Sequence, residues 1–235
     1  MNSLIPKSCI YTLFFIVTAL FANAQTNPVG IFDAHTDIGA VKIKGSVTYN
    51  AALQQYQISA SGKNIWAVDD EFHFAYKKIK GDFLLRANMR LTGTSAQAHR
   101  KVGWIVRKSL EANSPHISAT MHGDGLAALQ YRKSAGDSTA NVGTAVLQGQ
   151  TSIIQLERKG NTYTMRVARE GEPFTFEQVT TLNLGDEVYA GLFTCAHDAD
   201  KAETGVFSNV RIISPATSDP VFSKKYIGSQ IELLD

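Results

Sequence analysis

The chain has 235 residues and a formal net charge of only +2 at pH 7. This near-neutral balance argues against nucleic acid or an anionic membrane surface as a partner, because both attract strongly basic proteins. The length exceeds that of an average domain but is normal for one all-β sandwich or barrel, which can bury a substantial core.

Residues 1–24 have the pattern of a secretory signal peptide. Lys7 supplies the positive charge, 10–21 form an apolar run, and Ala22-Asn23-Ala24 is a small-x-small cleavage site. The run is too short for a comfortable membrane span, which needs about 20 residues. We therefore expect a mature N-terminus at Gln25, a periplasmic or extracellular location, and no membrane span after cleavage. A retained N-terminal anchor is the alternative.

Cleavage would leave one cysteine. Cys9 precedes the apolar run and leaves with the signal, so Cys195 has no intrachain partner. Loss of Lys7 brings the mature charge to +1. The export route is oxidising, yet the stability of the mature chain must come from packing rather than from a disulfide.

The mature sequence alternates apolar and polar residues with a period of two, broken by Gly, Asn and Asp turns. It shows no sustained apolar pattern at helical spacing. Strands are predicted within 82–91, 101–109, 116–125, 126–134, 152–171 (a hairpin turning at 159–161), 188–196 and 205–213. About a dozen short strands at this spacing predict an all-β fold with two packed antiparallel sheets, most simply a jelly roll.

The character of the sequence changes after Ile213. The predicted sandwich domain covers 25–214, and 215–235 is predicted to be a linker followed by a terminal strand. That strand either returns to the sandwich as an edge strand or begins a following domain.

Three stretches carry a family resemblance: "WAVDDEFHFAYKKIKGDFLL", "GWIVRKSL" and "GLFTCAHDADKAETGVFSNVRI". They resemble a bacterial family of unknown function in the concanavalin A-like lectin/glucanase superfamily, described in places as "regulation of enolase". The resemblance covers about Phe32 to Ile213, and its most specific pieces are Gly81-Asp82-Phe83 and 206–210. It implies a concanavalin A-like jelly roll.

The same resemblance leaves the function open. The superfamily contains lectins, glycosidases, polysaccharide lyases and binding modules without activity. The terminal stretch "YIGSQIELLD" resembles the join to a TolB-like β-propeller in some relatives. The resemblance therefore implies either a glycan or a propeller or envelope protein as a partner.

Residues 195–203 gather a thiol, an imidazole and carboxylates. Calcium bound by Asp198 and Asp200 is one reading, but the spacing matches no full calcium loop. Zinc would find only Cys195 and His197 close together. We favour a charged turn over 197–204 between two strands, with no cofactor and with calcium as the weaker alternative.

Patterns typical of enzymes with this fold are missing. No E-x-D-x-x-E, Q-[IV]-H or G-x-S-x-G motif occurs in the chain. Asp69, Asp70 and Glu71 are consecutive, so neighbouring carboxylates point in opposite directions on a strand. Cys195 lies in an apolar strand, which indicates a buried and inert thiol. An enzyme is therefore the less favoured class.

The strongest indication of a ligand-binding site is the set of polar residues that alternates with apolar residues on the middle strands. The candidate ligand-binding residues in this set are Arg86, Arg107, His116, His122, Gln130 and Arg132. If their strands are neighbours, these side chains line one face, where arginine can bind a carboxylate or sulfate and amides can bind sugar hydroxyls. Trp66 and Tyr76 are candidates for stacking, whereas Trp104 belongs to the apolar phase. An ordinary solvated outer face is the competing interpretation.

We therefore predict an exported, non-catalytic carbohydrate-binding module that holds a polysaccharide or oligosaccharide on its concave sheet. One alternative is a docking module for a propeller or envelope protein. The other is a glycoside hydrolase or polysaccharide lyase that uses His116 or His122 as a base. All three depend on strand phase, because a register error of one residue would invert the face.

Overall fold

A computed structural model describes residues 28–93, 97–146 and 152–216. The predicted signal peptide and nearly all of the predicted terminal segment lie outside these ranges. The described residues form two antiparallel sheets of seven strands each. None of them forms a helix, so this part of the chain contains no helix that could cross a membrane.

The first sheet has the strand order β1-β4-β13-β6-β7-β8-β9. Its strands are β1 (Ala34–Ile38), β4 (Phe72–Lys80), β13 (Glu187–Cys195), β6 (Lys101–Arg107), β7 (His116–His122), β8 (Leu126–Arg132) and β9 (Ala140–Val146). Neighbours that are distant in sequence, such as β13 beside both β4 and β6, identify crossed connections rather than a simple meander.

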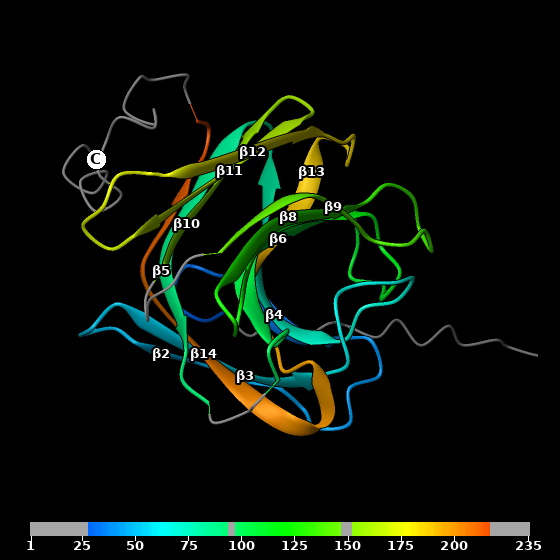
Figure 1. Ribbon diagram of the computed structural model, residues 1–235, viewed down its shortest axis with the longest axis vertical. Helices are drawn as coiled ribbons and strands as arrows, with labels where there is room; N and C mark the ends of the chain where they lie inside the picture. Colours follow the sequence, from blue (N-terminus) through cyan, green and yellow to red (C-terminus); the bar gives the residue numbers. More distant parts are fainter. Residues whose placement is uncertain (1–27, 94–96, 147–151, 217–235) are drawn as a thin grey trace, which may run out of the picture.

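The second sheet has the order β12-β11-β10-β5-β14-β3-β2. Its strands are β12 (Phe176–Thr181), β11 (Thr162–Arg169), β10 (Ser152–Lys159), β5 (Phe83–Leu91), β14 (Asp198–Ile213), β3 (Gln55–Gly62) and β2 (Ser46–Asn50). Figure 1 shows this sheet packed over the convex side of the first. The predicted all-β, two-sheet antiparallel class is confirmed.

The apolar phase of each strand builds the core between the sheets. On β5, Phe83, Leu85 and Met89 are buried there, and on β6 Trp104 is fully buried, as its phase predicts. This two-sided packing follows from alternation, because every second side chain of a strand points to the same face.

The predicted turn over 197–204 is too long. The structure turns at Ala196-His197, where His197 has a left-handed φ of 55°, and β14 begins at Asp198. The register to β3 then shifts between Asp198 and Glu203, which marks a bulge. Glu203 is fully buried and lies 3.0 Å from Arg100, and this ion pair holds the charged stretch against the sandwich.

The concave face of the first sheet, turned away from the second sheet, carries its own apolar layer. Figure 1 shows loops crossing this side. The layer consists of Ile38, Ile65, Phe72, Phe74, Ile105, Phe193 and Cys195. Ile65 comes from the loop between β3 and β4, so this loop covers part of a face that the alternation pattern alone would leave open to solvent.

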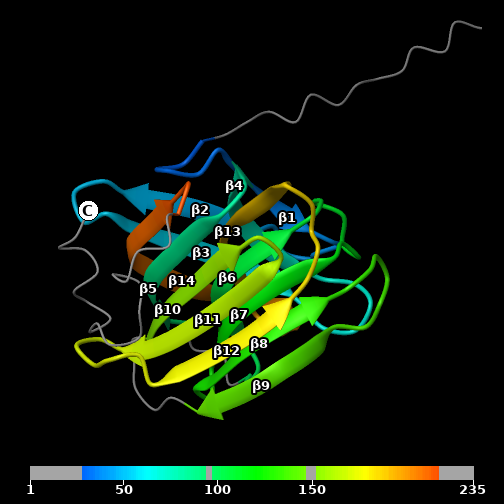
Figure 2. The ribbon, with the colours of Figure 1, turned by 90° about the horizontal axis from the view of Figure 1, so that it is seen from above.

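The two sheets also meet at one edge. Figure 2 shows β12 of the second sheet lying beside β9 of the first. The backbone N–H of Leu129 on β8 donates to Oε1 of Gln178 on β12 over 2.9 Å. This buried hydrogen bond joins the sheets at the side where the first sheet ends.

Candidate ligand-binding site

The strand register brings most of the predicted site residues together. His116 on β7 lies opposite Arg107 on β6 and opposite Arg132 on β8. Gln130 follows on β8, two residues before Arg132. Their strands are neighbours, as the prediction required.

Arg86 does not join them. It lies on β5 in the second sheet, opposite Gln155 of β10, and it is fully buried. Its neighbours Leu85 and Ala87 face the core, so Arg86 points to the outer side of the second sheet. The polar phase of β5 and that of β6–β8 therefore belong to opposite faces of the molecule.

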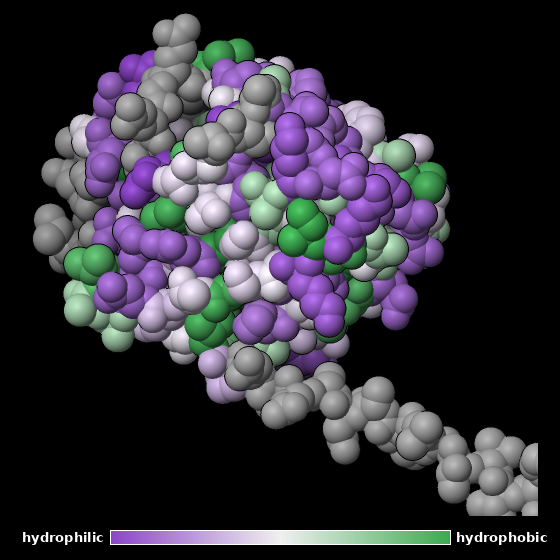
Figure 3. Space-filling view, turned by 90° about the horizontal axis from the view of Figure 1, so that it is seen from below, coloured by the Kyte–Doolittle hydropathy of each residue, from purple (hydrophilic) through white to green (hydrophobic). Residues whose placement is uncertain are grey.

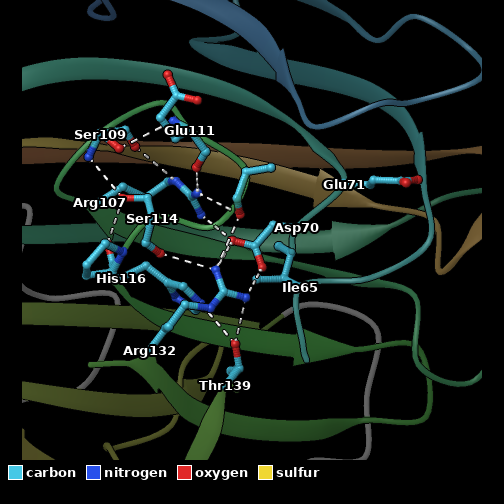
Figure 4. A network of polar contacts seen from close by, with 12 residues as sticks. Ile65, Asp70, Glu71, Arg107, Ser109, Glu111, Ser114, His116, Arg132 and Thr139 are labelled. Atoms are coloured by element: carbon cyan, nitrogen blue, oxygen red, sulfur yellow. Dashed lines mark hydrogen bonds and ion pairs between the residues drawn. The ribbon is translucent and has the colours of Figure 1, made fainter. Parts of the chain in front are cut away.

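Arg107 and Arg132 are tied to one carboxylate (Figure 4). Nη1 of Arg107 lies 2.6 Å from Oδ2 of Asp70, and Nη2 of Arg132 lies 2.7 Å from Oδ1 of the same residue. All three side chains are fully buried. Glu71, the next residue, points away from the group. We call Asp70, Arg107 and Arg132 the Asp70 cluster.

Electrostatics keep the Asp70 cluster ionised. Burial alone would raise the pKa of Asp70, but the positive groups around it prevail and hold that pKa below its ordinary value. At neutral pH these groups are the two guanidinium ions, because burial lowers the pKa of His116 to about 3. His116 is therefore a neutral, enclosed imidazole, a poor position for a catalytic base.

The Asp70 cluster also holds neighbouring loops in place through hydrogen bonds to their backbone. Arg132 Nη2 donates to the backbone oxygens of Trp66 and Ala67 over 2.9 and 3.1 Å. Arg107 Nη2 donates to the backbone oxygen of Glu111 over 2.6 Å. Both guanidinium groups are thus engaged inside the protein. Their position corrects the expectation that they grip a ligand directly, because loops cover the part of the face that holds them.

Beyond these loops a cavity of about 250 Å³ remains open over β6–β9. It is lined by Asn64, Trp66, His99, Lys101, His122, Leu126, Gln130, Asn141 and His197. We call it the Trp66 pocket. His122 and Gln130 belong to the predicted site, and Trp66 was a predicted stacking residue.

Trp66 offers an aromatic surface at the pocket. Its side chain remains 39% exposed although its backbone is held by Arg132. An indole that is anchored at the backbone and open at the ring can stack on the apolar face of a ligand at little entropic cost.

The side-chain amine of Lys101 is buried at the pocket. The residue is 2% exposed, and its Nζ donates to Oδ1 of Asn64 over 2.8 Å. No carboxylate forms an ion pair with it among the described residues. Burial lowers its pKa, since removal from water disfavours the charged form.

His122 is neutral at the same pocket. Burial, followed by the charge of Lys101, lowers its pKa to about 4. Its Nδ1 lies 2.9 Å from the backbone oxygen of Leu126, which can only accept, so Nδ1 carries the proton. The other ring nitrogen, Nε2, is therefore a hydrogen-bond acceptor. The rings of His99 and His122 are 5.9 Å apart, and those of His99 and His197 are 5.6 Å apart.

Gln130 has spare hydrogen-bonding capacity. It is 4% exposed, and its Oε1 has no partner among the described residues. Asn141 lies opposite it on β9 and also lines the pocket. Buried amide oxygens are almost always paired, so an unpaired one at a cavity wall indicates a position for a ligand or an ordered water.

Asp198 and Asp200 lie at the start of β14. The Asp198 carboxylate lies 3.9 Å from Lys201, and that of Asp200 lies 2.8 Å from Lys42. Within the described part of the chain, no three His, Cys, Asp or Glu side chains are grouped to hold a metal ion. The calcium alternative gains no support from this geometry.

Cys195 is enclosed by backbone. Burial raises the pKa of its thiol to about 11, and its Sγ lies 3.3 Å from the oxygen of Glu71. It lies in the apolar layer of the concave face. These surroundings match the expected inert thiol, because reactive cysteines have a low pKa and are accessible.

Lys101, His99, Asn64 and Asn141 were missed by sequence reasoning. For Lys101 a signal existed, since it shares the phase of Arg107 on the same strand. His99 and Asn64 lie in loops, where no periodicity operates. A larger cavity of about 430 Å³ is lined partly by Arg90, Arg100 and His122.

Comparison with solved structures places the fold among known sandwiches. No protein-family model matches the chain, and no curated protein is significantly similar to it in sequence. A functionally unknown protein from Saccharomyces cerevisiae is similar with a TM-score of 0.58 and 17% identity, over 78% of this chain and 97% of that chain.

Two similar structures have names that state a ligand class. Carbohydrate-binding module CBM66 from Bacillus subtilis matches with a TM-score of 0.50 and 12% identity, over 80% of this chain and 100% of that chain. Lectin UEA-II complexed with galactose matches with a TM-score of 0.50 and 8% identity, over 77% and 98%. A sandwich of this kind also forms part of a longer glycoside hydrolase. The chain therefore has the predicted concanavalin A-like jelly-roll fold.

Proposed function

We propose that this protein is a non-catalytic carbohydrate-binding module whose binding site is the Trp66 pocket. The observation that carries the proposal is the meeting of an exposed, anchored indole with buried polar groups that have unused hydrogen-bonding capacity. A sugar ring presents an apolar face for stacking and hydroxyl groups for hydrogen bonding, so both halves of the pocket have a counterpart.

The fold supports the same function at a coarser level. A carbohydrate-binding module and a galactose complex of a lectin are built on similar sandwiches. Because one fold hosts many functions, this likeness raises the plausibility of a glycan ligand, and the pocket supplies the specific argument.

The experiment is a glycan array probed with the full chain, its Trp66→Ala variant and a Leu53→Ala control. Leu53 is 65% exposed and does not line the pocket, so its loss removes an apolar surface group elsewhere. We expect binding to one glycan class, weakened at least about tenfold by Trp66→Ala, which corresponds to about 1.4 kcal/mol. Equal binding by both variants, or no binding by any protein, would refute the proposal.

A hydrolase or lyase is supported less well by the pocket. None of the described residues that line it is a carboxylic acid, whereas glycosidases of the common type need two. The remaining base candidate is His122, whose pKa of about 4 makes it a weak base.

A protein-docking module would need a broad apolar patch. On the face seen in Figure 3, hydrophobic residues are scattered between hydrophilic ones. Trp66 and Val68 are exposed near each other on one loop, but they adjoin the polar pocket. This face and the surroundings of Trp66 therefore fit a small polar ligand better than a large apolar partner.

We further propose that the chain belongs to the bacterial "regulation of enolase" family, with a TolB-like propeller as a partner domain, and that it is exported after loss of residues 1–24. The motifs quoted above and the signal-like N-terminus support these statements. N-terminal sequencing of the protein recovered outside the cytoplasm checks the export step. Gln25 as the first residue is expected, and an intact Met1 would contradict cleavage.

A further inference from the structure

We infer that the Trp66 pocket selects an acidic sugar residue, one that carries a carboxylate or sulfate group, and that Lys101 binds this anion. The inference rests on the proposed function and names its ligand class. It starts from the titratable side chains of the pocket, which are all basic among the described residues.

Among the described residues that line the pocket, every titratable side chain is basic. These side chains are Lys101 and the histidines His99, His122 and His197. Carboxylates of the surrounding elements have other partners: Asp70 with its two arginines, Glu203 with Arg100, Glu71 with Lys63, Asp198 near Lys201, and Asp124 with the backbone N–H of Leu126. No acidic group of the described chain therefore neutralises the Lys101 ammonium by contact.

The charged form of Lys101 is costly for the protein in isolation. Lys101 is 2% exposed and has one hydrogen-bond acceptor, Asn64 Oδ1, although an ammonium has three donors. Buried charges are normally paired, because removal from water is unfavourable without an opposite charge. An anionic ligand in the pocket would supply that charge.

The other polar groups argue for a sugar rather than a simple anion. Gln130 Oε1 is an unpaired acceptor. The unprotonated nitrogen of His122 can also accept a hydrogen bond. Acceptors repel an inorganic anion but bind hydroxyl groups. With about 250 Å³, the pocket is smaller than the roughly 300–1,000 Å³ typical of drug-sized ligands, which suits a single ring.

The test compares sugars that differ only in the acidic group. The full chain is titrated calorimetrically with methyl glucuronide against methyl glucoside, with the corresponding galactose pair, and with glucose 6-sulfate. We expect the acidic member of at least one pair to bind at least about tenfold more tightly than the neutral member. The carboxylate and sulfate arms distinguish the two acidic groups.

Lys101→Met tests the assigned residue, because methionine keeps most of the length of the side chain without its charge. We expect this variant to bind the acidic and the neutral sugar of a pair about equally, and still to bind the neutral sugar. Lys63→Met is the matched control, because Lys63 lies on the loop that carries Asn64 and Trp66 but is exposed and paired with Glu71. It should leave the preference for the acidic sugar unchanged.

A second measurement covers the case in which Lys101→Met does not fold. In the unaltered protein, raising the salt to about 0.5 M should weaken acidic sugars several-fold more than neutral ones. Equal affinity within each pair would overturn the inference but leave the carbohydrate-binding proposal standing. Inorganic sulfate binding as tightly as the acidic sugars would also overturn it. No binding of any sugar, acidic or neutral, would overturn both.

Discussion

Asp70 shows how one residue links stability to the site. Its carboxylate holds Arg107 and Arg132, and Arg132 in turn holds the backbone of Trp66. A buried ion group of this kind contributes little net stability compared with an apolar replacement, but loss of one partner leaves uncompensated charge. The Asp70 cluster therefore acts mainly by specifying where the pocket loop lies.

Asp70→Asn should destabilise the protein strongly. The change removes the negative charge between two fully buried guanidinium groups, so we expect a loss of about 3–5 kcal/mol in the free energy of unfolding. Urea denaturation measures it. The control is Asp69→Asn, whose residue is exposed and should change stability by less than about 0.5 kcal/mol. Similar losses in the free energy of unfolding for the two variants would show that the Asp70 cluster is not charged in solution.

Two buried histidines predict a loss of stability in mild acid. The folded-state pKa values of His116 and His122 are about 3 and about 4, while an unfolded histidine titrates near 6.5. Below a pH of about 6.5 these histidines bind protons in the unfolded chain but not in the folded chain. The free energy of unfolding therefore falls as pH drops, by up to about 1.4 kcal/mol per pH unit for each histidine.

The measurement is urea denaturation between pH of about 6.5 and 4.5, which is above the range in which Asp70 changes its protonation. Asp70 has a lowered pKa, so the stability it adds is lost only as pH falls below about 3.9. His116→Gln should reduce the slope of the unfolding free energy against pH, by the amount that corresponds to about one bound proton. A slope that this substitution leaves unchanged would mean that His116 is already protonated in the folded protein.

At the scale of elements, the sequence predicts to which face of a sheet each strand side chain points. It does not predict which loops cover that face. The alternation on β6, β7 and β8 correctly placed Trp104 in the core and Arg107 on the opposite face. Local sequence holds no sign of what covers that face. Arg107 meets Asp70 across 37 positions of sequence, and Arg132 meets it across 62, so no short window contains both partners.

The same reasoning explains the two errors of placement. Arg86 has the right phase but belongs to the other sheet, because phase does not determine which sheet a strand joins. The charged stretch after Cys195 contains no apolar alternation and was predicted to be a turn. The structure draws it into β14 through the buried pair of Glu203 with Arg100, a tertiary contact.

The joined edge of the sandwich yields a prediction at this scale. Gln178→Ala removes the acceptor of the buried Leu129 N–H, which leaves a donor without a partner, so we expect a loss of about 1–3 kcal/mol in the free energy of unfolding. Val179→Ala is the control, since Val179 is exposed on the same strand. Equal stability of the two variants in urea would mean that water satisfies Leu129.

At the scale of the whole molecule, the two faces of the first sheet have separate tasks. The convex face packs on the second sheet and supplies the core. The concave face carries the apolar layer, the Asp70 cluster and the Trp66 pocket. Because the cluster holds the loop that carries Trp66, we expect the pocket to be a rigid site rather than one that forms on binding.

The most direct test of the account is a fluorescence titration of the full chain with the glycan selected on the array. The chain has two tryptophans, and Trp104 is fully buried in the core whereas Trp66 is exposed at the pocket. We predict a saturable change in emission that disappears in Trp66→Phe, which retains only Trp104. A change of equal size in that variant, or glycan binding without any change in emission, would contradict the assignment of the pocket as the binding site.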